Sequence, residues 1–557
     1  TMIYLKDTAS PQEYDQAIFR LQNQYVREYK DKDGNVIKYN MKPQTLLVDF
    51  EPGRMFRMQE SKSQIYNINT EKKGNSKLGE RIAEELRISP IIVVNKDKMR
   101  EVEPNDILEA VNAYSANKSI KDEATDIPVD EGLLANEDIV DVLKALYPIG
   151  SKKGIKMPAY KGSGDDMDTG DTSENKEDEE KSSSEKRKEE SNEDGENLMK
   201  KLSTYYSLIL FFAFLTNSKV SSLDDILKAI GSSVENRRIA KNVGLDKDVL
   251  LTIRTIINPY VLSELDYKVA HMNHMSHDDS IPASDRVDRA MKKFGRLSTS
   301  EIVTPAWVAD KMVGYLPADR IKHGTKILDI ASKQGEFANA LYKAFGDKVK
   351  DTVYSLPTSS LTYEFTRKVY TLLGLPVKNV IKDYISCDLL NDKKKEKIMN
   401  EFISLGTDII IGNPPYQDDA VGEQKTYNGP IYNLYLDCAY SISDVVEMIH
   451  PARFLSNAGS TPKAWNKKML EDKHLMIASF HQNAKDLFDD LQLTGGIVVT
   501  YRDKKKKFSP INVFMPYAEL ESICNKVTSF RNFKPMSGIV VSRTAYRFTE
   551  LMHIEHP

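Results

Sequence analysis

The segment "DIIIGNPPYQ" at residues 408–417 joins an apolar run to a loop that has polar atoms but few backbone donors. The apolar part is short, β-branched and uninterrupted, which predicts a buried strand. Pro414 and Pro415 end that strand, because each proline removes a backbone N–H and fixes one φ angle. The loop therefore offers a side-chain amide at Asn413, an available carbonyl at Pro414 and a phenol at Tyr416.

These groups suit an exocyclic amine on a heteroaromatic ring, whose lone pair is delocalised into the ring and attacks poorly. The side-chain oxygen of Asn413 and the carbonyl oxygen of Pro414 would accept its two N–H groups and hold the nitrogen closer to tetrahedral. Tyr416 would offer a flat face for stacking. No strong base is required, because the alkylated amine is a cation that loses its proton readily. The alternative is a turn without chemistry, since Asn-Pro-Pro is a common turn sequence.

A second stretch, "ILDIASKQGEFA" at 327–338, has the pattern of a strand, a loop with a glycine, and a helix. Backbone N–H groups at such a helix start suit a polar or charged ligand. Asp329 at the strand end could bind the amino end of a cofactor, and Gly335 would allow close backbone approach. A tight turn between strand and helix explains the pattern equally well.

From about residue 296, strand and helix patterns alternate. Strands are predicted at 325–331, 351–356, 378–386, 407–413, 444–451 and 495–501, and helices at 335–345, 362–374 and 433–442. This alternation predicts an α/β fold with a mostly parallel sheet and helices on both faces. Ligands of such sheets bind beyond the carboxyl ends of the strands, where the 413–416 loop is expected.

Residues 296–505 resemble the N6-adenine DNA methyltransferases with an NPPY motif in the gamma order, in which the cofactor motifs precede the catalytic motif. The resemblance implies a Rossmann-like domain that uses S-adenosylmethionine and acts on double-stranded DNA. It implies a catalytic motif formed by Asn413, Pro414, Pro415 and Tyr416, with Tyr416 also contacting the substrate. Residues 506–557 would begin a target-recognition region.

The same resemblance implies a cofactor site. "STSEIVTPAWVADKMV" is similar to the segment that folds over the methionine part of the cofactor, and "DIASKQGEF" to the family's glycine loop. Asp388 matches the acidic position near the cofactor's adenine, and Phe480 is a candidate to hold a flipped base. The residues implied to bind the cofactor are Thr304, Pro305, Asp329, Ala331, Gly335, Phe337 and Asp388.

Two departures from the family bear on the cofactor. Lys333 occupies the position of the first glycine, and its charge should weaken binding of a sulfonium cation unless the side chain turns to solvent. No acidic residue follows the predicted strand "VYSLP" to bind the ribose, and Glu364 lies well into the next helix. These departures leave open a degraded methyltransferase fold that only binds DNA or partners. Another planar target, an RNA guanine or a protein glutamine, is also compatible with the motif.

The 557 residues are too many for one core. Residues 161–197 are charged and almost free of apolar side chains, which predicts a disordered linker, with a single charged helix as the alternative. A mostly helical coupler is expected at 51–160 and a helical domain at 198–295. Histidines at 271, 274 and 277 could bind a metal, but we expect a polar helix surface and no metal site.

Residues 1–50 resemble the end of the second motor lobe of superfamily 2 helicases. Gln16 and Arg20 match a helix that reaches the ATP phosphates in that family, whereas Phe19 and Asn23 depart from it. A chance amphipathic helix is the alternative. The resemblance suggests a piece of a longer helicase–methyltransferase polypeptide of a restriction–modification system, with further subunits or missing parts as partners.

The bulk composition fits this reading. The formal net charge is −4, so a surface for nucleic acid must be a local patch, for which Lys292, Lys293 and Arg296 are candidates. Three widely spaced cysteines fit a reducing compartment, and we expect a cytoplasmic protein. No signal peptide is recognised, the apolar run at 205–215 is too short to span a bilayer, and no membrane association is expected.

Overall fold

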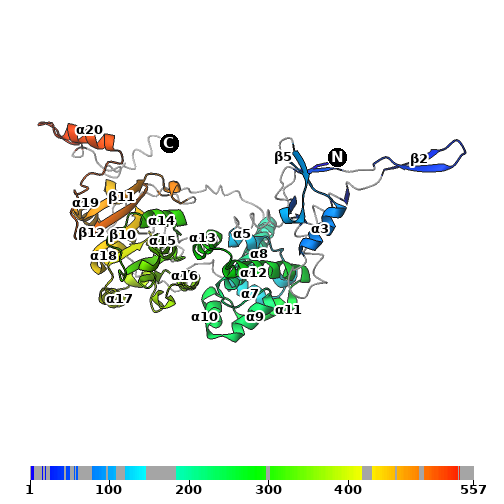
Figure 1. The fold of residues 1–557 in the computed structure, drawn as a ribbon, viewed down its shortest axis with the longest axis horizontal. Helices are drawn as coiled ribbons and strands as arrows, with labels where there is room; N and C mark the ends of the chain where they lie inside the picture. The colour runs from blue at the N-terminus through cyan, green and yellow to red at the C-terminus, as the bar shows by residue number, and fades with distance from the viewer. Residues whose placement is uncertain are drawn as a thin grey trace. The chain divides into compact units, whose positions relative to one another are not determined.

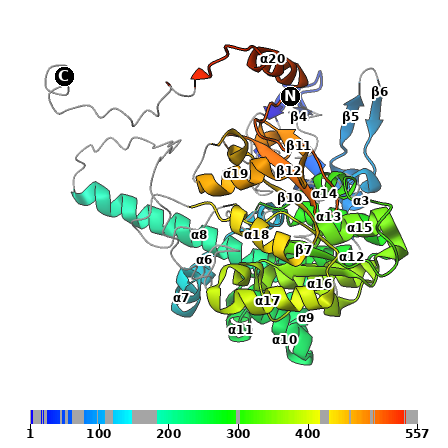
Figure 2. The same ribbon diagram turned by 90° about the vertical axis from the view of Figure 1, so that its left-hand side faces the viewer.

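The structure is a computed structural model of the chain (Figures 1 and 2). It describes residues 2–4, 16, 19–20, 25–42, 46–49, 55–56, 58–59, 78–95, 98–107, 119–145, 183–295, 302–416, 429–457, 461–488, 493, 495–536 and 539. The chain divides into two compact units. The first comprises Thr1–Ser151 and Lys181–Leu297, and the second Ser298–Pro557 together with residues 152–180, which lie outside the described part. The division falls near residue 296, where the methyltransferase region was expected to begin.

The second unit is built on a six-stranded sheet in the order β11-β12-β10-β9-β7-β8. The neighbours β8, β7, β9 and β10 are parallel, whereas β12 is antiparallel to both β10 and β11. The predicted mostly parallel sheet is therefore confirmed. The strands are β7 (Ile327–Ser332), β8 (Val353–Pro357), β9 (Ile409–Gly412), β10 (Val445–Pro451), β11 (Leu475–His481) and β12 (Ile497–Asp503).

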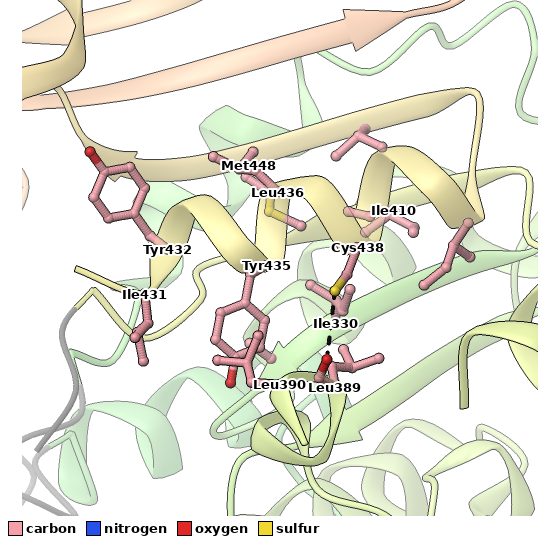
Figure 3. Packing of buried hydrophobic residues seen from close by; sticks show 14 of the residues in the cluster. Ile330, Leu389, Leu390, Ile410, Ile431, Tyr432, Tyr435, Leu436, Cys438 and Met448 are labelled. Atoms are coloured by element: carbon pink, nitrogen blue, oxygen red, sulfur yellow. Dashed lines mark hydrogen bonds between the residues drawn. The ribbon is translucent and has the colours of Figure 1, made fainter. Parts of the chain in front are cut away.

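Helices cover this sheet, and every residue of β7, β9 and β10 is buried, as expected for strands covered on both faces. On one face, Ile330, Ile410 and Met448 of the strands pack against Tyr435 and Leu436 of α18 (Figure 3). The helices of this unit are α14 (Ala306–Val313), α15 (Glu336–Phe345), α16 (Ser360–Leu373), α17 (Asp392–Leu405), α18 (Tyr432–Ile442), α19 (Lys463–Glu471) and α20 (Ala518–Thr528).

Local sequence signals set the bounds of these helices. Ser359 caps α16 by accepting from the backbone N–H of Thr362, and Gly374 ends the helix in the left-handed conformation. Asn391 and Gly406 do the same for α17. These ends are therefore fixed by short-range chemistry.

One predicted strand is absent from the second unit. Residues 378–386 contain part of the 3₁₀-helix η2 (Val377–Asn379), and a single bridge joins Val380 to Ser355. The side-chain amide of Asn379 donates to the carbonyls of Asp351 and Val353. This side chain therefore takes the place of the backbone N–H groups that a further strand beside β8 would provide. The sheet consequently ends at β8.

The first unit is mostly helical in its described part. Its aromatic centre includes Phe211, Phe214 and Phe294, whose ring centroids lie 4.7 Å apart in both pairs that include Phe294. Its helices are α3 (Leu78–Ile88), α5 (Ile120–Thr125), α6 (Glu131–Leu134), α7 (Glu137–Ala145), α8 (Ser183–Leu215), α9 (Leu223–Ser232), α10 (Val234–Val243), α11 (Lys247–Ile256), α12 (Pro259–His277) and α13 (Ala283–Lys293).

Three two-stranded sheets complete this unit. The first pair, β1 (Met2–Tyr4) with β4 (Leu47–Asp49), is parallel. The other pairs are antiparallel: β2 (Val26–Lys30) with β3 (Val36–Asn40), and β5 (Ile92–Asn95) with β6 (Lys98–Glu101). Gln16 and Arg20 are exposed in a helical conformation, and the helicase resemblance stays a prediction.

The disordered linker was predicted too long. Residues 183–197 form the first part of α8, one long helix in Figure 2, so the helical alternative holds there. Helix nucleation is the costly step, and the buried residues of 202–215 provide it for the charged residues that precede them. Residues 161–182 lie outside the described part. Within α8, Asn197–Leu215 is long and apolar enough to cross a membrane, but about two-thirds of it is buried, as in the core helix of a soluble protein.

A buried ionic cluster joins α5, α12 and α13. The Glu123 carboxylate accepts from Lys268 Nζ at 2.7 Å and from Lys293 Nζ, and all three residues are buried. Lys293 is therefore not available for DNA phosphates, contrary to the prediction. Nearby, His277 Nδ1 lies 2.8 Å from the carbonyl oxygen of Asn273. The described residues contain no group of three or more His, Cys, Asp or Glu side chains that could hold a metal ion.

Candidate active site

Two adjacent parallel strands bring the predicted motifs to one edge of the sheet. Asp329 of β7 pairs in register with Ile411 of β9, so Asn413 lies only two residues beyond the level of Asp329. Gly412 makes this proximity possible, because a Cβ at that position would approach Ile330 Cγ2 to 3.0 Å and Asp329 Oδ1 to 3.7 Å. The two loops that sequence analysis singled out are thus neighbours.

The Asn413 amide is buried and held by its nitrogen. Nδ2 donates to the carbonyl of Ile302 at 3.1 Å and to Thr304 Oγ1 at 3.2 Å. The carbonyl of Ile302 can only accept, so the hydrogen-bond network fixes which way the amide faces. The other side-chain atom, Oδ1, is buried and has no hydrogen-bond partner among the described residues. A buried acceptor without a donor is costly, and such an atom suits a ligand that brings an N–H group.

The rest of the motif presents a main-chain acceptor and a buried aromatic ring. No described residue donates a hydrogen bond to the Pro414 carbonyl, which leaves a second acceptor beside Asn413. Tyr416 is buried, with 6% of its surface exposed, and its hydroxyl has no partner among the described groups. Its carbonyl accepts from the N–H of Ile431 at 3.1 Å. Stacking on a substrate would therefore require the Tyr416 ring to become exposed, and that role stays a prediction.

Asp329 and Glu336 form a buried acidic pair at the glycine loop. Asp329 Oδ1 accepts from the N–H of Ala331 at 3.2 Å, and Glu336 Oε2 from the N–H of Gln334 at 2.8 Å. The remaining oxygens, Asp329 Oδ2 and Glu336 Oε1, are buried without hydrogen-bond partners in the described structure. Burial, and then the nearby Glu336 carboxylate, raise the pKa of Asp329 well above its usual range. The pair would therefore favour a ligand that is cationic or rich in donors.

Gly335 starts α15 with a φ of +73°, a conformation that favours glycine. An added Cβ would also approach Val369 Cγ1 of α16 to 3.1 Å, so the glycine is needed for helix packing. Phe337 and Ala331 are buried core residues. Their side chains thus support the loop from inside the domain.

The segment before the first strand contacts the catalytic motif directly. Thr304, predicted to contact the cofactor, is 1% exposed and accepts from Asn413 Nδ2. Pro305 follows as the N-cap residue of α14. Two residues later, Trp307 leaves 52% of its surface exposed. The observed role of Thr304 is to orient Asn413.

The Lys333 side chain is inside the protein and does not face solvent. It is 1% exposed, and its Nζ donates to the carbonyls of Ile302 at 2.5 Å and Asn413 at 2.9 Å. These hydrogen bonds of Lys333 were not predicted from the sequence, and neither were the roles of the Ile302 carbonyl and the Glu336 carboxyl group. The position of a main-chain carbonyl cannot be recognised from residue types. Lys333 itself could be recognised as unusual, because it is a charged residue where the resembled family has a glycine.

Two further predicted residues have partners of their own. Asp388, in the 3₁₀-helix η3 (Ser386–Leu390), accepts from the N–H of Ile385 at 3.1 Å and pairs with Lys394 Nζ at 2.8 Å. Phe480 lies on β11 with its ring centroid 4.9 Å from that of Phe514. Their predicted contacts with cofactor and base stay predictions. Beyond β8 the chain presents hydroxyls, with Thr358 Oγ1 and Thr362 Oγ1 3.2 Å apart, where the resembled family has an acidic residue.

The six-stranded sheet and the helices that cover it form a Rossmann-like α/β domain, as predicted. Residues 349–488 match the family described as Eco57I restriction-modification methylase. The match covers about a quarter of the chain and includes the Asn-Pro-Pro-Tyr loop. This segment is therefore similar to restriction-modification methylases.

Several solved structures are similar at low identity. The type I restriction-modification methyltransferase subunit from Streptococcus thermophilus is 15% identical over 62% of this chain and 80% of that one, with a TM-score of 0.38. DrdV, solved as a DNA complex, is 13% identical over 90% and 53%, with a TM-score of 0.39, so this chain spans about half of DrdV. A class I S-adenosylmethionine-dependent methyltransferase from Listeria monocytogenes, itself described as putative, is 10% identical over 58% and 97%, with a TM-score of 0.30. No curated protein matches the chain.

Proposed function

We propose that the second unit transfers a methyl group from S-adenosylmethionine to N6 of an adenine in DNA, as part of a restriction–modification or phage-defence enzyme. The observation that carries this proposal is the buried Asn413 Oδ1, which has no donor among the described residues, while the nitrogen of the same amide is held twice. An exocyclic amine would supply the missing N–H. The matched methylase family supports the reaction class.

The chemistry follows from two acceptors that lie side by side in the chain. Asn413 Oδ1 and the Pro414 carbonyl would bind the two N–H groups of the adenine amine and return its lone pair toward the nitrogen. The nitrogen then forms a bond to the methyl carbon as the carbon–sulfur bond breaks. The methylated amine, briefly a cation, loses one proton to solvent. Because both acceptors are fixed before the substrate arrives, little reorganisation is required.

The residues of the glycine loop fit the cofactor. When bound, S-adenosylmethionine supplies an activated methyl group on a sulfonium sulfur. Asp329 and Glu336 each have a buried oxygen without a donor, which suits the ammonium end of the cofactor. Gly335 keeps the loop free of a side chain at the helix start. Thr304, Pro305 and Asp388 stay candidates from the family resemblance, and the ion pair of Asp388 with Lys394 would have to coexist with that role.

The substrate would be double-stranded DNA with the target base rotated out of the helix. A base inside the duplex cannot reach an acceptor that is buried within the protein, so flipping is required. Tyr416 and Phe480 would then be candidates to hold the ring. Further subunits or parts of a longer polypeptide would be partners, and the enzyme would act in the cytoplasm.

The proposal is tested by incubating the chain with S-adenosylmethionine labelled on its methyl group and a mixture of DNA, RNA and protein substrates. We expect label in DNA, released as N6-methyladenine after digestion. Label in RNA or in protein would show that the substrate is an RNA guanine or a protein glutamine and not DNA. Cofactor binding without label in any substrate would favour the degraded fold.

A further inference from the structure

Lys333 places a positive charge deep inside the second unit, in the loop between β7 and α15. Only 1% of its surface is exposed. Burying an ammonium group is costly unless hydrogen bonds and nearby charge compensate for the lost water. A lysine at this depth therefore requires strong acceptors, and the structure shows which acceptors they are.

Two acceptors among the described residues are main-chain carbonyls from distant segments. Lys333 Nζ donates to the carbonyl of Ile302 at 2.5 Å and to that of Asn413 at 2.9 Å. The carbonyl of Ile302 also accepts from Asn413 Nδ2 at 3.1 Å. The glycine loop, the catalytic loop and the segment before α14 thus meet around one ammonium group. Asp329, within β7, is close enough for the Lys333 charge to oppose the rise in its pKa.

We propose that Lys333 is a positioning residue, which fixes the main chain of Asn413 and so the direction of the Asn413 side-chain oxygen. The inference rests on the proposed function and adds to it a coupling between the cofactor loop and the catalytic loop. Without the ammonium, the Asn413 carbonyl loses its described partner and the Ile302 carbonyl loses one of two. The Asn413 side chain would then keep the hydrogen bonds that its Nδ2 donates, but the backbone of Asn413 would no longer be held in place.

Three variants separate positioning from other roles. Lys333→Met keeps the length of the side chain and removes its donors. Lys333→Gln keeps N–H donors on a shorter side chain, which cannot reach both carbonyls. Lys348→Met is the control, because Lys348 is an exposed lysine of the same unit in the 3₁₀-helix η1 (Gly346–Lys348). Each variant is measured for kcat, for the KM toward DNA, and for hydrogen exchange of peptides that contain residues 302–304 and 413–416.

For Lys333→Met we expect kcat to fall roughly a hundredfold, since a displacement of about 1 Å at a reacting group has an effect of that size. The KM for DNA should stay within about twofold, and both peptides should exchange faster. Lys348→Met should match the unaltered protein. If hydrogen exchange of both peptides is unchanged in Lys333→Met, Lys333 does not hold the two segments together. If exchange is faster but kcat is unchanged, Lys333 has no positioning role.

If Lys333→Met does not fold, Lys333→Gln decides. We then expect an intermediate loss of kcat, about tenfold, with faster exchange at either peptide. A glutamine variant with full kcat and full protection overturns the proposal. If the unaltered protein transfers no methyl group, the proposed function fails, whereas the exchange measurement still decides whether Lys333 holds the two segments.

Discussion

The side-chain nitrogen of Asn413 donates hydrogen bonds within the protein, whereas the side-chain oxygen has no donor among the described residues. We expect Asn413→Ala to lower the turnover of methyl transfer at least about a hundredfold, the usual cost of removing one fixed group that stabilises a transition state. Cofactor affinity should change little, because the oxygens of Asp329 and Glu336 that are proposed to bind the cofactor make no hydrogen bond with Asn413. Labelled methyl transfer and calorimetry measure the two effects. Asn525→Ala, on the exposed surface of α20, is the matched control. Full turnover in Asn413→Ala would make the loop purely structural.

Asp329 should make cofactor binding depend on pH. Burial and the neighbouring Glu336 raise the pKa of its carboxyl group, so the free protein holds a proton there more tightly than an ordinary aspartate does. A cationic ligand favours the carboxylate, so binding should release a proton, and affinity should weaken as the pH falls through the raised pKa. Calorimetry in buffers of different ionisation enthalpy measures this release. Asp329→Asn should bind weakly and release no proton. An affinity independent of pH would contradict the assignment.

At the scale of residues, candidate site residues could be predicted from the sequence where their position depends on the residues next to them in the chain. Asn413 could be predicted because it follows a short apolar strand, and Asp329 because it is the acidic residue within one. The burial of Tyr416 and the contact between Phe480 and Phe514 depend on tertiary packing, which local sequence does not encode. The link from Lys333 to Ile302 joins residues whose backbone positions only the folded domain defines.

At the scale of elements, β10 contains a buried acid that the proposed mechanism does not use. Neither carboxylate oxygen of Glu447 has a hydrogen-bond partner in the described structure, and burial raises the pKa of this group well above its ordinary value. For an acid with a raised folded-state pKa, stability falls as the pH rises from the unfolded-state value toward the folded-state one. At neutral pH the buried group is therefore destabilising.

We expect Glu447→Gln to stabilise the second unit at neutral pH, because the amide is neutral without binding a proton, whereas the buried acid must take one up; the gain is about 1.4 kcal/mol for each pH unit above the unfolded-state pKa. The gain should shrink toward pH 4, where the acid is protonated in both states. Thermal unfolding at several pH values measures it. Glu519→Gln, on the exposed side of α20, should have no such effect. A glutamine variant less stable than the unaltered protein would indicate that Glu447 has a partner.

Elements with strong periodicity were predicted well, and those with competing side-chain bonds were not. The strands at 325–331, 407–413 and 444–451 are all present as β7, β9 and β10. Residues 378–386 have a strand-like composition, but the amide of Asn379 bonds to the backbone beside β8. At 183–197 the charged composition indicated disorder, whereas continuity with the buried part of α8 makes the segment helical.

At the scale of the whole molecule, the two compact units should unfold in separate transitions. Glu123 tests this, because it lies only in the first unit. Burial alone would raise its pKa, but Lys268 and Lys293 overcome that effect and lower the pKa to about 2. The resulting stability is present above the unfolded-state pKa of about 4.5 and is lost as the pH falls toward about 2.

Glu123→Gln leaves two buried ammonium groups without their shared carboxylate. We expect it to destabilise the first unit by roughly 3–5 kcal/mol at neutral pH, as breaking a buried ion pair usually does. Scanning calorimetry should show only one of two transitions shifted, and the other should be the one that Glu447→Gln moves. A single transition that both variants shift would mean that the units unfold together.

The chain contains two tryptophans, and the structure gives them opposite surroundings. Trp307 is exposed at the start of α14, three residues after Thr304, whereas Trp465 is buried against Tyr432 and Phe454. The protein therefore has a built-in fluorescent probe beside the candidate site and an internal reference within the core. Acrylamide should quench the emission of Trp307 and spare that of Trp465. A ligand that covers the segment before β7 should protect Trp307 from the quencher, so binding can be followed optically without an attached dye.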